Sequence, residues 1–270
     1  YAGNEDNHVY MLSIEDGALI GDINVQRRIY DVDVAPDGER ILISAGTTAA
    51  KHNLMIYTPA GEQLFNRQYR TTIKGARFAT DGNSIVAVNN RGELVRMDLE
   101  GEELNKVKLS YEQVGLVTLG AGRYLSMGIE GTYQIFDEDL NVLRGGRPPV
   151  PGGDEATAIG ADASGEFVFV GTKERFVYAM NAQDQVIYQD RLGNSITSFL
   201  PLGDTVLITG LGDFVSSLNV ADLSNIALLT TLKAALNLAV PILAVLAAFC
   251  LLMAVPGSHK ALVKLAKALY

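Results

Sequence analysis

One turn position recurs along the first 222 residues at a nearly constant interval. It can be followed at Gly17, Gly61, Gly101, Leu140, Asp184 and Asp222, with intervals of 44, 40, 39, 44 and 38 residues. Short apolar or alternating runs lie between the turns, for example Arg40 to Ser44, Ser84 to Val88 and Arg175 to Met180. Such runs are typical of β-strands that are buried on one or both faces. About four short strands in every repeat of about 40 residues predict a β-propeller, in which each repeat is one blade.

The repeat divides the chain into six visible units. We place a partial blade at residues 1–27 and further blades at 28–69, 70–109, 110–149, 150–192 and 193–231. The first blade lacks its first strand, because Tyr1-Ala2-Gly3 already matches the second strand of later blades, as Val170-Gly171-Thr172 does. We therefore expect an all-β propeller domain of about six four-stranded blades over residues 1–231. We also expect Tyr1 and Tyr270 to be internal positions of a longer protein.

Two segments carry a resemblance to a known family. His8 to Ile23 (HVYMLSIEDGALIGDI) and Val170 to Gln189 (VGTKERFVYAMNAQDQVIYQ) resemble the repeat of PQQ-like and WD40-like β-propellers. The resemblance implies the fold, but these propellers include enzymes, scaffolds and sensors. The chain has no tryptophan. The positions nearest to where the family repeat places its blade-closing tryptophan are Gly21, Asn66, Asn105 and Gln189.

Charge and cysteine content restrict the classes of partner and chemistry. All 31 carboxylates and 18 of the 22 basic residues lie in residues 1–222, which gives this part a net charge of -13. Because nucleic-acid binding requires a basic surface, we do not expect nucleic acid as a partner. The single cysteine, Cys250, lies in the apolar run near the C-terminal end, so the repeat domain offers no thiol nucleophile or thiolate metal ligand.

No motif in the sequence predicts catalysis. The histidines His8, His52 and His259 are far apart and have no metal-ligand spacing, so we expect each to be solvated or in a turn. The acidic run from Asp31 to Gly38 fails as a calcium loop, and we place its first two aspartates on one strand face near the propeller axis. No glycine-containing segment of the sequence matches a phosphate-binding motif or a nucleophile elbow. We therefore predict no enzyme activity, no cofactor, and no catalytic, cofactor-binding or metal-ligating residues.

One insertion between two blades is a candidate docking loop. The segment RGGRPPVPGG, residues 144–153, contains prolines, is flanked by glycines and carries two arginines in an acidic domain. Its candidate contact residues are Arg144, Arg147, Pro148 and Pro149. The alternative interpretation is a linker that closes a wider gap between blades.

The C-terminal region predicts a membrane span. Ala234 to Val255 runs for 22 residues without a charge, which is enough for a helix to cross the hydrocarbon core of a bilayer. We assign residues 232–256 to the transmembrane helix and residues 257–270 to a short basic amphipathic helix. That helix suits an anionic membrane surface or an elbow that packs on further spans. The membrane-interface residues are Lys233 before the span and Lys260, Lys264 and Lys267 after it, which places the C-terminal side in the cytoplasm and the propeller outside it.

These features together predict a non-enzymatic, extracytoplasmic binding or assembly module on a membrane. The expected partners are the lipid bilayer and either other membrane subunits or extracytoplasmic proteins. The layout resembles transporter permeases of the ABC type with an outward propeller between the first helix and the transport core. Two alternatives remain open, a single-span sensor or receptor and a membrane-bound quinoprotein-type enzyme.

Overall fold

The structure is a computed structural model that describes residues 2–3, 7–13, 15–48, 51–162, 164–212 and 214–223. The chain divides into two compact units, Tyr1–Val220 and Ala221–Tyr270. Within the described residues, no helix is long and apolar enough to cross a membrane. The predicted span, the four interface lysines at 233, 260, 264 and 267, and the domain boundaries after residues 231 and 256 lie outside the described residues.

The described residues of the first unit form six antiparallel sheets, which we call blades 1 to 6. Blade 1 contains β1 (Ala2–Gly3), β2 (His8–Leu12) and β3 (Leu19–Asn24). Blade 2 contains β4 (Arg28–Val34), β5 (Ile41–Thr48), β6 (Lys51–Tyr57) and β7 (Gln63–Tyr69). Blade 3 contains β8 (Ile73–Phe78), β9 (Ser84–Asn89), β10 (Glu93–Asp98) and β11 (Glu103–Lys108). Blade 4 contains β12 (Gln113–Leu119), β13 (Arg123–Gly128), β14 (Tyr133–Phe136) and β15 (Val142–Gly146). Blade 5 contains β16 (Ala156–Ala161), β17 (Val168–Thr172), β18 (Phe176–Met180) and β19 (Val186–Arg191). Blade 6 contains β20 (Ile196–Leu202), β21 (Thr205–Gly210) and β22 (Val215–Asn219).

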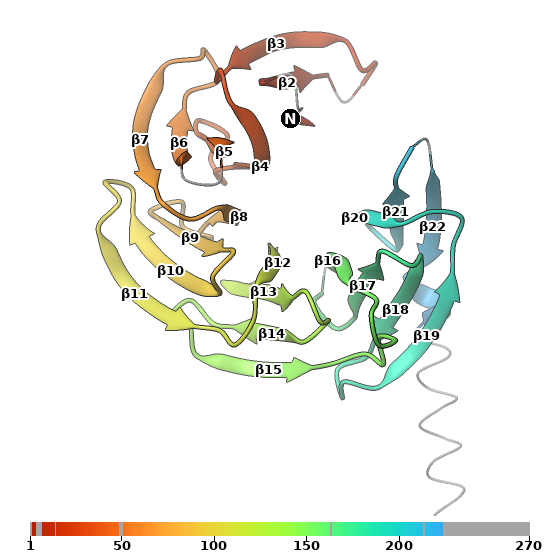
Figure 1. Cartoon of the computed structure of the whole chain (residues 1–270). Coiled ribbons are helices and arrows are strands. Elements are labelled where there is room, and N and C mark those ends of the chain that lie inside the picture. Colours follow the sequence, from red (N-terminus) through yellow and green to blue (C-terminus); the bar gives the residue numbers. More distant parts are fainter. Residues whose placement is uncertain are drawn as a thin grey trace, which may run out of the picture. The chain divides into compact units, whose positions relative to one another are not determined.

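The blades follow one another around a common axis (Figure 1). In each four-stranded blade the strands pair in chain order, the first strand lies nearest the axis and the fourth lies on the outside (Figure 1). This confirms the predicted all-β, propeller-like fold. Among the described residues blade 1 has three strands, as the match of Ala2-Gly3 to a second strand predicts, and blade 6 also has three.

The cores lie between neighbouring blades. One cluster joins Leu125, Met127 and Tyr133 of blade 4 to Val168 and Tyr178 of blade 5. Similar clusters join blades 1 and 2, 2 and 3, 3 and 4, and 5 and 6. The second strands of blades 3 and 5, β9 and β17, are buried at every position, as strands that are covered on both faces are. The outer strands are largely exposed. The chain has no tryptophan, and Tyr124, Tyr133 and Tyr178 are among its largest fully buried side chains.

The repeated turn position is confirmed in five of its six occurrences. Gly17, Gly61, Gly101, Leu140 and Asp184 all have positive φ, between 59° and 85°, and lie in the hairpin between the third and fourth strands of a blade. Leu140 and Asp184 adopt this conformation although it disfavours side chains that carry a Cβ. The sixth prediction is wrong, because Asp222 lies in the helical residues 220–223 that follow β22.

Candidate functional site

The predicted docking loop separates into a packed part and an exposed part. Arg144 lies on β15 and its Nε donates a 2.6 Å hydrogen bond to Asp184 Oδ1 in the turn of blade 5. Its Nη2 donates to the carbonyl of Asn181 and, at 3.3 Å, to the hydroxyl of Tyr133, which itself donates to Asp184. Burial is the main reason that the pKa of the Tyr133 phenol lies above its ordinary value. Arg144 therefore joins blade 4 to blade 5, and its guanidinium is engaged within the fold.

The exposed part begins at Arg147. Pro148 is buried and Val150 packs on the core between blades 4 and 5, whereas Arg147 and Pro149 are exposed. Tyr178 Oη on β18 also holds the segment by donating to Pro149 O at 3.4 Å, and within the segment Val150 N donates to Pro148 O at 2.8 Å. Arg147 forms no ion pair with any residue that the structure describes. The loop thus presents one cation on a backbone that is held against the domain.

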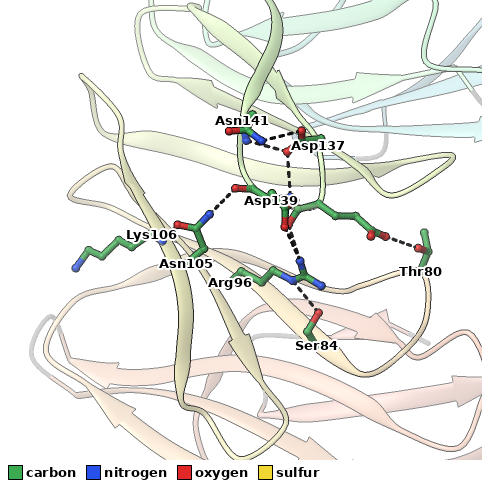
Figure 2. A network of polar contacts seen from close by, with 9 residues as sticks. Thr80, Ser84, Arg96, Asn105, Lys106, Asp137, Asp139 and Asn141 are labelled. Atoms are coloured by element: carbon green, nitrogen blue, oxygen red, sulfur yellow. Dashed lines mark hydrogen bonds and ion pairs between the residues drawn. The ribbon is translucent and has the colours of Figure 1, made fainter.

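Neighbouring blades are also joined at a second place, between blades 3 and 4 (Figure 2). Arg96 on β10 donates to Glu138 O at 3.0 Å and to Asp139 Oδ1 at 3.4 Å, and Asn105 on β11 donates to Asp139 O. Thr80 Oγ1 donates to Glu138 Oε1 at 2.9 Å. The turn of blade 4 is therefore held by polar side chains of blade 3, in the same way that Arg144 holds the turn of blade 5.

The register defines the position that makes these contacts. Each pairing of a third with a fourth strand contains a bulge, and the first fourth-strand residue after it is Gly21, Phe65, Asn105, Arg144 or Tyr188 in blades 1 to 5. The tryptophan equivalents expected from the sequence were Gly21, Asn66, Asn105 and Gln189. Gly21 and Asn105 occupy this position, whereas Asn66 and Gln189 lie one residue beyond it. The role of this position cannot be read from one repeat, because its contacts reach across to the next repeat.

The two acidic residues placed near the axis connect blades 2 and 3. Asp31 accepts a 2.9 Å hydrogen bond from Ala76 N and pairs with Arg77, and Asp33 accepts a 2.7 Å bond from Phe78 N. Burial raises the pKa of the Asp33 carboxyl above its ordinary value, with Arg77 opposing the shift. A hollow of about 240 Å³ at the axis is lined by first strands, including Asp31, Arg77 and Thr157. These carboxylates satisfy backbone donors of the adjacent blade, so their placement has a structural explanation.

Each histidine was expected to be solvated or in a turn. Of the two histidines that the structure describes, His8 meets this expectation and His52 does not. His8 is partly exposed and lies 2.5 Å from Asp22 Oδ2 through its Nδ1. His52 is buried and its Nε2 lies 3.1 Å from Thr72 Oγ1, because β6 faces the core over nearly its whole length. His259 lies outside the described residues. In the described part of the chain, no three His, Cys, Asp or Glu side chains cluster as metal ligands would.

The comparisons with known proteins concern the fold. No family model and no curated protein matches the sequence. Among solved structures, the chain is similar to the WD40 repeats of RRP9, with a TM-score of 0.67, 13% identity, and coverage of 80% of this chain and 71% of that one. It is equally similar to U3-55K, with a TM-score of 0.66, 13% identity, and coverage of 80% and 72%. The β-propeller domain of Cps50 (Swd1) from Myceliophteria thermophila gives a TM-score of 0.56 and 16% identity, over 71% of this chain and 65% of that domain. The chain thus spans just under two thirds of the Cps50 domain, and the likeness establishes a WD40-like propeller.

Proposed function

We propose that this chain is a non-enzymatic binding or assembly module, in which a WD40-like propeller presents a fixed surface to a protein partner. The observation that carries the proposal is the exposed segment from Arg147 to Gly153. Pro148 and Val150 anchor it while Arg147 and Pro149 face solvent, so little conformational freedom is lost when a partner binds. The Arg147 guanidinium, which has no ion pair among the described residues, lies on a domain of net charge -13 and favours a partner that offers a carboxylate.

We further propose that the propeller is held at a membrane and faces away from the cytoplasm. The uncharged run from Ala234 to Val255 and the lysine asymmetry around it support this placement. A span of this kind near a propeller suits an accessory domain of a larger membrane protein such as a transporter permease, and the partner is then another membrane subunit or an extracytoplasmic protein. Resistance of the full-length protein to extraction by alkaline carbonate would support the anchorage. Release into the wash would contradict it.

Site-specific photocrosslinking in native membranes tests the docking role. Gly152 is exposed with no atom within 4 Å of where a Cβ would lie, so p-benzoylphenylalanine can replace it without a clash. The matched control places the same crosslinker at Leu104, which is 56% exposed on blade 3. We expect a discrete crosslinked product from position 152 that is absent from position 104.

Arg147 supplies the specificity control. Arg147→Ala should weaken the product formed from position 152, and Arg147→Lys should restore part of it, since the positive charge returns but the guanidinium fork does not. Equal products from positions 152 and 104, or no effect of Arg147→Ala, would refute the role of this segment.

A further inference from the structure

Blade 1 lacks the side chain that joins each of the next blades to its neighbour. At the register position after the bulge, Phe65 reaches the turn of blade 3, where a Cβ on Gly101 would lie 2.8 Å from Phe65 Cζ. Asn105 and Arg144 bind the turns of blades 4 and 5. The residue of blade 1 at this position is Gly21. It carries no side chain with which to contact the turn of blade 2.

A pocket of about 410 Å³ lies at this position. Its lining includes Met11, Leu12 and Ile20 of blade 1 and Pro59 and Ala60 in the turn of blade 2. Leu12 is 45% exposed and Ile20 is 71% exposed. We call this hollow the Gly21 groove. Because the equivalent position of blade 2 carries a phenyl ring that contacts a turn of the same kind, the groove has the position and the apolar walls that suit a planar ring.

The groove and the two turns beside it carry acidic residues. Asp22 is the charged member of the described lining; its side chain is 43% exposed and its Oδ2 lies 2.5 Å from His8 Nδ1. The turn between β2 and β3 adds Glu15 and Asp16, the turn between β6 and β7 adds Glu62, and neither turn contains a lysine or arginine. The rim is therefore complementary to a cation and unfavourable to an anion.

We propose that the Gly21 groove binds an aromatic side chain of a partner polypeptide that carries basic residues beside it. The aromatic ring takes the place that Phe65 occupies in the next blade, and the basic residues face Asp22 and the acidic turns. Aromatic anchors in apolar pockets supply much of the energy of protein interfaces. This surface is distinct from the segment at residues 147–153, so either proposal can fail without the other.

The test uses methyl NMR on the full chain in detergent with ¹³C-labelled methionine methyls. The chain has six methionines, and Met11 lines the groove, so its signal, assigned with Met11→Leu, reports a ring placed there. The probe is the blocked peptide Gly-Lys-Trp-Lys-Gly. The two control peptides replace its tryptophan with alanine or its lysines with glutamates.

We expect the Lys-Trp-Lys peptide to shift the Met11 methyl signal saturably and the Lys-Ala-Lys peptide to leave it unchanged. The Glu-Trp-Glu peptide should bind at least about threefold more weakly, because exposed charge pairs are individually modest. That difference should shrink at high salt, which screens exposed charges.

Two variants locate the site. Gly21→Trp should fill the groove and weaken binding at least about tenfold, because the added ring excludes the peptide's own. A Cβ at Gly21 lies close only to the flexible end of Met11, at 2.8 Å from Cε, and φ there is not positive, so the variant can be accommodated. Leu104→Trp, an exposed addition on blade 3, should leave binding unchanged. Asp22→Asn should reduce the difference in affinity between the Lys-Trp-Lys and Glu-Trp-Glu peptides. This variant provides a readout that does not depend on the folding of Gly21→Trp.

Three results would overturn the proposal. The first is a Met11 methyl signal that none of the peptides shifts. The second is a shift that is equal for the tryptophan and alanine peptides or that survives Gly21→Trp. The third is a nuclear Overhauser contact, before any peptide is added, between Met11 and an aromatic ring of the chain other than Tyr57, which belongs to the core cluster that Met11 packs against. Such a contact would identify the occupant as the protein's own segment.

Discussion

Replacing Arg144 with alanine should loosen the contact between blades 4 and 5. The change removes a 2.6 Å charge-assisted hydrogen bond to Asp184, the bond to Asn181 O and a 3.3 Å contact with Tyr133. Hydrogen bonds to charged groups contribute about 1.5–3 kcal/mol each when one partner is removed. The side chains of Arg144 and Asp184 are 17% and 29% exposed, so water compensates part of this loss. We expect Arg144→Ala to lower the free energy of unfolding by about 2–3 kcal/mol in total.

Urea unfolding of the full chain followed by circular dichroism in the β-sheet region measures this loss. Arg144→Lys keeps the charge but cannot form the same fork of hydrogen bonds, so we expect about half the loss. Arg147→Ala is the matched control, and because Arg147 is exposed it should cost less than about 0.5 kcal/mol. Equal effects of the two alanine substitutions would refute the assignment of Arg144 to blade packing and of Arg147 to the free surface.

Two further predictions concern backbone and charge. Gly61 and Gly101 share a φ of 85°, but only Gly101 has neighbours within 4 Å, with Phe65 at 2.8 Å from the added Cβ. Alanine at Gly61 should therefore cost about 1–2 kcal/mol of unfolding free energy and alanine at Gly101 about 1–3 kcal/mol more; equal costs in urea titrations would contradict the interblade contact. Because burial raises the pKa of Asp33 in the folded state, the contribution of this group to stability is fully present below its unfolded pKa and is lost as pH rises through its folded pKa. The stability of the wild type relative to Asp33→Asn should fall as the pH rises above 3.8, the ordinary pKa of an aspartate. A rise in that direction would reverse the sign we assign.

Local patterns in the sequence were sufficient to predict the blades, since strand periodicity and turn residues act within each repeat. The positive φ at Gly61 and Gly101 follows from glycine itself, and even Leu140 could be placed by its interval from them. Contacts between repeats were not predictable in the same way. Arg144 was expected to be a docking residue, and its burial against Asp184 depends on how one blade meets the next.

The groove at Gly21 illustrates the same limit. The absence of a bulky residue at this position is visible in the sequence, but a glycine there is equally compatible with a turn or with a packed strand. Only the register with Met11 and the approach of Pro59 and Ala60 from blade 2 identify it as an opening. Sequence patterns of a repeat protein thus locate positions well, whereas the function of a position depends on the neighbouring repeat.

The orientation of the propeller across a membrane is the most direct test of the proposed function. Residues 1–222 contain no cysteine, so a single cysteine introduced at the exposed residue Ser110, with Cys250 replaced by serine, reports the side on which the domain lies. A membrane-impermeant maleimide should label Ser110→Cys in intact spheroplasts that make the full-length protein, and should label Lys267→Cys only after the membrane is permeabilised. Labelling of Lys267→Cys in intact spheroplasts with protection of Ser110→Cys, or equal labelling of both, would contradict an outward propeller anchored by the span at residues 234–255.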